Sequence, residues 1–114
     1  MSTPDHDPPL RVWRVGEMIA LEGDLDLDTR SLLESVVAVT TDDEPVVLDL
    51  SRVWFVDSQG LRSLLAIQDR HQLTLARPSQ AVRRLLEIAG VEAMFHILAD
   101  DATSSDGNAS TAAG

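Results

Sequence analysis

One short segment holds the residues that could carry chemistry. In VWFVDSQGLRSLL, residues 53–65, Asp57 and Ser58 follow an apolar run and come just before Gly60 and a leucine-rich stretch. An Asp-Ser pair before a helix is a typical N-cap signal, because a side-chain oxygen there accepts a hydrogen bond from an unpaired backbone N–H. The start of a helix also favours negative charge. A phosphate on Ser58, which adds about 1.5 to 2 negative charges, could therefore be accommodated without unfolding the domain.

Such a modification would act mainly on binding. A tenfold loss of affinity needs only about 1.4 kcal/mol, and one like-charged or desolvated contact beside a phosphate can exceed that. The residues alone leave two interpretations of Ser58 open, a helix cap and a phosphorylation switch.

A serine hydrolase is a further interpretation of Ser58. The nucleophile motif G-x-S-x-G is incomplete in Val56-Asp57-Ser58-Gln59-Gly60, because the first glycine is missing. The chain is also far shorter than an α/β-hydrolase, and no histidine is clearly placed as a general base. The sequence therefore predicts a protein that is not an enzyme.

Metal and thiol chemistry are not indicated either. The chain has no cysteine, and its three histidines are scattered without metal-ligand spacing. Asp24, Asp26 and Asp28 resemble the start of a calcium loop, but Thr29 and Ser35 stand where such a loop needs glycine and glutamate. We expect neither a metal nor another cofactor.

The charge balance narrows the range of partners. The chain has 19 acidic and 9 basic residues, a net charge of −10. Nucleic acid binding needs cations that displace counterions, so DNA and RNA are not expected partners. The first ten residues, MSTPDHDPPL, lack the features of a signal peptide, and no apolar run approaches the length of a membrane span. We expect a cytoplasmic protein without a membrane partner.

Hydrophobic periodicity predicts the elements that must position Ser58. Strands are expected at 10–15, 18–23, 46–50, 73–76 and 94–99, and helices at 29–39, at 58–69 and after Ser79. Asp28 or Thr29 is the expected N-cap of the first helix, and Gly90 the end of the last. The first two strands form a predicted hairpin, and the later ones alternate with helices, which implies parallel pairing.

These elements predict an α/β fold made of a single small domain. Its mixed, mostly parallel sheet of four to five strands would pack against three to four helices. We expect this domain to span residues 10–100. Residues 1–9, rich in proline and aspartate, and residues 101–114, rich in small polar residues, are expected to be disordered tails.

Four stretches in a fixed order carry a family resemblance: LEGDLDLDTRSLL, VVLDLSRVWFVDSQGLRSLL, LTLARPSQAVRRLLEIAGV and MFHI. Together they resemble the STAS domain family, in particular the bacterial anti-sigma factor antagonists. Gly23, Leu25 and Asp26 fall on the family's Leu-x-Gly-x-Leu-Asp pattern. The segment from Asp57 to Leu61 is similar to its Asp-Ser-x-Gly-Leu pattern.

The resemblance implies a STAS-like fold and a role in transcription regulation, such as a stress response. In that family, an unphosphorylated antagonist binds an anti-sigma factor that is also a serine kinase, and a sigma factor is released. The kinase phosphorylates the serine after the aspartate, and a serine phosphatase resets the antagonist. By position that serine is Ser58, and the matching partner surface is Asp26, Asp57, Ser58, Gln59 and Arg62.

The resemblance also leaves an alternative role open. The chain could be a STAS docking subunit of a lipid-transport ATPase or of a stress-signalling scaffold, without a phosphorylation switch.

Two features depart from the family pattern. Many relatives have a second hydroxyl residue where this chain has Gln59, which leaves Ser58 as the expected acceptor. The segment between Ser58 and Pro78 is also shorter than usual by more than one helical turn. The second helix must therefore end early, or the loop after it must tighten.

Overall fold

The first two strands form the hairpin that the alternating pattern predicts. In the computed structural model, which describes residues 9–40 and 44–98, β1 (Leu10–Val15) pairs antiparallel with β2 (Met18–Leu25). Gly16 in the turn has a φ of 62°, in the left-handed region that glycine adopts without steric cost. The tails expected at 1–9 and 101–114 lie outside the described residues, apart from Pro9.

The remaining strands add to the hairpin in parallel. They are β3 (Val46–Val56), β4 (Leu73–Ala76) and β5 (His96–Leu98), and the sheet order is β1-β2-β3-β4-β5. The helices are α1 (Arg30–Ala38), α2 (Ser58–Arg70) and α3 (Gln80–Ala89), with a short 3-10 helix, η1 (Glu92–Met94), before β5. The predicted α/β fold with a mixed, mostly parallel sheet is confirmed.

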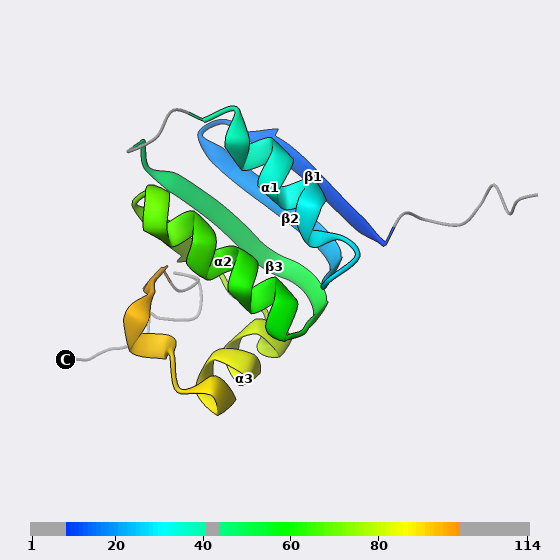
Figure 1. Ribbon diagram of the computed structural model, residues 1–114, viewed down its shortest axis with the longest axis vertical. Coiled ribbons are helices and arrows are strands. Elements are labelled where there is room, and N and C mark those ends of the chain that lie inside the picture. Colours follow the sequence, from blue (N-terminus) through cyan, green and yellow to red (C-terminus); the bar gives the residue numbers. More distant parts are fainter. Residues whose placement is uncertain (1–8, 41–43, 99–114) are drawn as a thin grey trace, which may run out of the picture.

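The core lies between one face of the sheet and the helices. Figure 1 shows α1 and α2 side by side across that face, and α3 packs against β3. The apolar side chains that meet there are almost completely buried; they include Leu25, Leu33, Leu48, Leu50, Leu64, Leu75 and Leu86. Each such leucine contributes about 1.5 to 3 kcal/mol on burial. None of the described helices is long and apolar enough to cross a membrane.

Three strands differ in length from the expectation, and the smallest difference is that β2 continues from the predicted end at 23 to Leu25. β3 has 11 residues and continues to Val56, beyond the predicted run at 46–50. Its pairing with β2 contains two register shifts, which break the alternation of inward and outward side chains in SRVWFV and hide the strand from pattern analysis. β5 is shorter than the predicted strand at 94–99, because η1 takes up Met94; Ala99 lies outside the described residues.

The segment after Ser58 reaches β4 through a short connection. α2 continues for 13 residues, and only His71 and Gln72 connect it to β4. The backbone N–H of His71 donates to Ile67 (3.0 Å), and the carbonyl of Gln72 accepts from Val46 N (2.8 Å). The buried ring of His71 lies with Nδ1 3.1 Å from the carbonyl oxygen of Glu44. The connection between α2 and β4 is therefore tight, as one of the two alternatives predicts.

The parallel pairing of β2 and β3 brings two loops to one edge of the sheet. Leu25 at the end of β2 is in register with Val56 at the end of β3. The backbone N–H of Asp57 donates to the carbonyl of Leu25 across this edge (3.3 Å). The loop that leads into α1 and the start of α2 therefore lie next to each other.

Candidate functional site

The start of α2 is capped by Asp57. This residue has an extended backbone, and its Oδ1 accepts hydrogen bonds from the N–H groups of Gln59 (2.9 Å) and Gly60 (3.0 Å). Ser58 is the first residue of the helix and is exposed. Among the described residues, its hydroxyl has no hydrogen-bond partner. The helix is thus capped by Asp57, and the Ser58 hydroxyl is exposed to solvent and not used in the cap.

Gly60 allows α2 to begin directly against the end of β2. A Cβ atom at this buried position would lie 2.3 Å from the carbonyl oxygen of Leu25 and 2.9 Å from Cγ2 of Val56. Both distances are shorter than real Cβ contacts allow, so only glycine fits without a shift. This close approach fixes the height at which Ser58 stands above the edge of the sheet.

Asp26 organises the loop before α1. Its Oδ1 accepts from the backbone N–H groups of Asp28 (3.0 Å) and Thr29 (3.1 Å). Thr29 occupies the predicted N-cap position, but its side chain makes no capping bond to the helix. The Thr29 hydroxyl instead donates to the carbonyl of Asp24 (2.7 Å) and accepts from Asp26 N (2.9 Å). The carboxylates of Asp26 and Asp57 therefore both have structural tasks.

Gln59 is held by a chain of side chains that joins the two helices. Its Oε1 accepts from Arg30 Nη1 (2.9 Å). Arg30 Nε lies 3.8 Å from Oε2 of Glu34, which also accepts from the hydroxyl of Ser63 (2.7 Å). Ser63 is only 1% exposed, so the chain is anchored inside the protein.

This network was not predicted. The only signal for it in the sequence is the i, i+4 spacing of Arg30 and Glu34, and that spacing indicates nothing about a contact with α2. Because a guanidinium has no acceptor, Gln59 must present its oxygen to Arg30. Its amide nitrogen is therefore left for other contacts.

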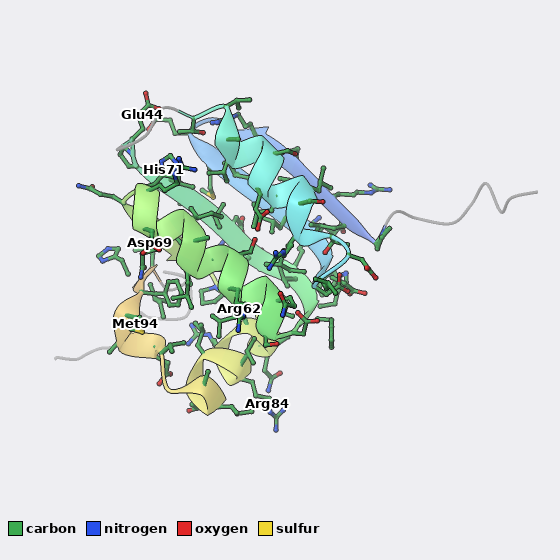
Figure 2. The ribbon with its side chains drawn as sticks, viewed as in Figure 1. Glu44, Arg62, Asp69, His71, Arg84 and Met94 are labelled. Atoms are coloured by element: carbon green, nitrogen blue, oxygen red, sulfur yellow. The ribbon has the colours of Figure 1, made fainter. Side chains whose placement is uncertain are left out.

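Arg62 lies one helical turn after Ser58 and is exposed. Within the described ranges it makes no hydrogen bond or ion pair. Figure 2 shows it on α2, on the side away from α1. The five residues predicted for the partner surface thus come from adjoining segments, but they differ in role: Asp26, Asp57 and Gln59 are engaged within the protein, whereas Ser58 and Arg62 are not.

Neither described histidine lies beside Ser58. His71 ends α2 at its opposite terminus. His96 is in register with Thr74 of β4, which pairs with Val47 near the start of β3, the end of that strand away from Ser58. The described residues also contain no group of three or more side chains that could hold a metal ion. What the arrangement offers is an exposed hydroxyl on a rigid support.

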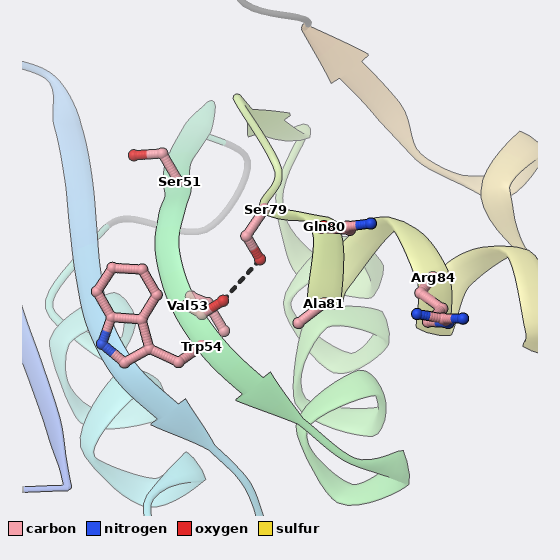
Figure 3. Close-up of a pocket in the computed structure, with 7 residues that line it drawn as sticks. All are labelled: Ser51, Val53, Trp54, Ser79, Gln80, Ala81 and Arg84. Carbon is pink, nitrogen blue, oxygen red and sulfur yellow. Dashed lines mark hydrogen bonds between the residues drawn. The ribbon is translucent and has the colours of Figure 1, made fainter.

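A cavity of about 570 Å³ lies elsewhere, between β3 and the start of α3. Figure 3 shows Trp54 and Arg84 among the residues that line it. The Ser79 hydroxyl, at the start of α3, donates to the carbonyl of Val53 (2.6 Å) and accepts from Val82 N (3.2 Å). This hydroxyl is therefore fully occupied in fixing α3 to β3. None of the predicted site residues lines this cavity.

The polar centre of the sheet's other face is the ion pair of Asp49 with Arg77. Asp49 Oδ1 also accepts from the backbone N–H of Ser51 (3.0 Å). Burial acts to raise the pKa of Asp49, but the hydrogen bond from Ser51 and the interaction with Arg77 outweigh it. The pKa of this carboxyl is therefore held below its ordinary value.

Solved structures share this fold. An anti-sigma factor antagonist from Mycobacterium paratuberculosis is 23% identical, with a TM-score of 0.64 over 90% of this chain and 93% of its own. The anti-sigma factor antagonist SpoIIAA in its unphosphorylated form is 16% identical, with a TM-score of 0.58 over 85% and 93%. A candidate antagonist from Thermotoga maritima is 18% identical, with a TM-score of 0.60 over 84% and 91%.

The sequence of the chain matches one protein-family model. A search among curated proteins found no match to the chain. Residues 13–99 match the family model described as "Mlab, STAS domain"; the matched residues include the second half of β1 and all of β2 to β5. Because this match covers most of the 114 residues, the chain belongs to the STAS domain family.

Proposed function

We propose that the protein is an anti-sigma factor antagonist that is switched at Ser58. Its unphosphorylated form binds an anti-sigma factor serine kinase, which frees a sigma factor, and phosphorylation of Ser58 ends the binding. The observation that carries this proposal is the exposed Ser58 hydroxyl, which has no hydrogen bond to a described residue because Asp57 caps the helix. The likeness in fold to antagonists such as SpoIIAA supports it.

The surface around Ser58 explains how a phosphate would act. Arg62 and the amide nitrogen of Gln59 offer hydrogen-bond donors near the neutral hydroxyl of Ser58. A partner that fits this surface places its own groups close to Ser58. A phosphate on Ser58 would place about 1.5 to 2 added negative charges directly against the partner's groups, without water between them. A loss of about 1.4 kcal/mol in binding free energy already weakens binding tenfold. A serine phosphatase would restore the hydroxyl, so the protein is a substrate of enzymes and not itself an enzyme.

The proposal is tested by incubating the purified protein with candidate anti-sigma kinases and ATP, followed by mass spectrometry of the peptide that contains Ser58. We expect one phosphate on Ser58. The Ser58→Ala variant should remain unmodified, whereas Ser31→Ala, which removes an exposed hydroxyl on α1, should be modified like the wild type. A phosphate on another residue, or none with any candidate kinase, would overturn the proposal.

A docking subunit without a switch is the second candidate. The description of the matching family model names Mlab and not an antagonist, and this supports the docking role as a second candidate. This role predicts stable co-purification with the subunits of a lipid-transport ATPase or with a stress-signalling scaffold. Neither Ser58→Glu nor phosphatase treatment should change that association.

A further inference from the structure

We propose that Arg62 binds the phosphate on Ser58 and is thereby withdrawn from the partner surface. This inference rests on the proposed function only in taking Ser58 as the modified residue. The switch then has two parts. Phosphorylation adds the negative charge of the phosphate, and it also occupies the Arg62 guanidinium that the unmodified protein presents to its partner.

The geometry of α2 places the two side chains together. Ser58 and Arg62 are at positions i and i+4 of a continuous helix, where Cβ atoms are about 5 to 6 Å apart. Both are exposed, while Gly60, Leu61 and Leu64 between and after them are buried. Ser58 and Arg62 therefore share the solvent face of α2. The order, with the anion nearer the N-terminus, is the favourable one for such pairs.

The backbone at the start of α2 has little left to offer a phosphate. The N–H groups of Gln59 and Gly60 already donate to the carboxylate of Asp57, and that of Leu61 donates to the Asp57 carbonyl (3.0 Å). A phosphate on Ser58 also stands beside the negative charge of Asp57. A side-chain cation is therefore needed to balance the new charge.

Arg62 suits this task better than Arg30. Arg30 is engaged with Gln59 and Glu34, whereas Arg62 makes no hydrogen bond or ion pair within the described part of the chain. At about 100° per residue, Arg62 lies about 40° around α2 from Ser58, but Gln59, which marks the side of Arg30, lies about 100° away.

The other charges near the site do not change this choice. Asp26 and Asp28 in the loop before α1 are anions and oppose a phosphate. From α3, the Arg83 side chain donates to the carbonyl of Pro78 (3.3 Å), and Figure 2 shows Arg84 on the far side of that helix. Asp57, Asp26 and Asp28 all raise the pKa of a phosphate on Ser58, and nearby arginines lower it.

The test measures the phosphate directly. Phosphoserine is placed at position 58 during protein synthesis, so no kinase is needed, and ³¹P NMR follows its second ionisation in the wild type and in single variants. We expect Arg62→Gln to raise this pKa by about half a unit, as Coulomb interaction of a mobile exposed pair predicts. The matched variant Arg30→Gln should raise it by much less, and Arg62→Lys should retain part of the effect. The difference should shrink in about 1 M salt.

An unchanged phosphate pKa in Arg62→Gln, or a larger rise in Arg30→Gln, would overturn the inference. A second measurement needs no arginine variant: the Nε–H resonance of Arg62 should shift when phosphoserine replaces Ser58, while that of Arg30 should not, and the absence of such a shift would also overturn it. Because the phosphate is installed during synthesis, a negative NMR result overturns only the role of Arg62 and not the proposed function. A negative kinase assay overturns only the proposed function, because the NMR measurements need no kinase.

Discussion

Two neighbouring residues at the start of α2 have separate tasks. Asp57 satisfies two backbone N–H groups, and Ser58 presents a hydroxyl to solvent. The sequence identified this pair, but it could not divide the tasks, because aspartate and serine are almost equally good caps. The division depends on which residue leaves the helical conformation, and the extended backbone of Asp57 decides it. Thr29 shows the same limit, since it stands at the predicted position without making a cap.

Removing the cap should cost stability, and removing the hydroxyl should not. We expect Asp57→Ala to lower the free energy of unfolding by about 1 kcal/mol, because two N–H groups lose their acceptor. Ser58→Ala should change it by less than about 0.5 kcal/mol. Urea denaturation of both variants measures the difference. If Ser58→Ala cost as much as Asp57→Ala, the assignment of the cap would be wrong.

The ion pair of Asp49 with Arg77 predicts a pH dependence. The folded-state pKa of Asp49 is lowered, so its contribution to stability is present above the unfolded value of about 3.9 and is lost as the pH falls through the folded value. Asp49→Asn should therefore lower the free energy of unfolding by about 1 to 2 kcal/mol at pH 7. This deficit should disappear in acid. Denaturation curves at several pH values check the result, and a deficit that persists below pH about 2 would contradict it.

At the scale of elements, the junction of β2, β3 and α2 sets the site. The sequence placed all three helices to within one or two residues, since their apolar faces follow the helical period. It missed the second half of β3, because the register shifts against β2 leave Trp54 and Phe55 both exposed and the alternation broken. It also missed the contact of Arg30 with Gln59, which depends on how two helices lie against each other.

Gly60 is the residue on which this junction depends. Gly60→Ala should push the start of α2 away from β2, because the new Cβ would meet a backbone oxygen that cannot rotate aside. We expect a loss of about 2 kcal/mol or more in the free energy of unfolding. Gly16→Ala is the comparison, because that turn has a positive φ but no atom within 4 Å of a Cβ, and strain alone costs about 1 kcal/mol. An equal or smaller loss for Gly60→Ala would speak against the close approach.

At the scale of the whole molecule, the parallel sheet explains why residues distant in sequence share one surface. β2 and β3 end at the same edge, so the loop with Asp26 and the start of α2 with Ser58 come together. Alternation of strands and helices predicted the parallel pairing, whereas the shared surface of Asp26 and Ser58 was implied by the resemblance to the STAS family. Which partner recognises the surface does not follow from the fold, because one scaffold supports many functions.

We propose that a neutral Ser58 permits binding and that a phosphorylated Ser58 prevents it. This switch is tested by isothermal titration of the two forms against the anti-sigma kinase that modifies the protein, with the unphosphorylated Ser58→Ala variant as the control. We predict at least about a tenfold higher Kd for the phosphorylated form and an unchanged Kd for Ser58→Ala. Equal affinities of the phosphorylated and unphosphorylated forms would contradict the account.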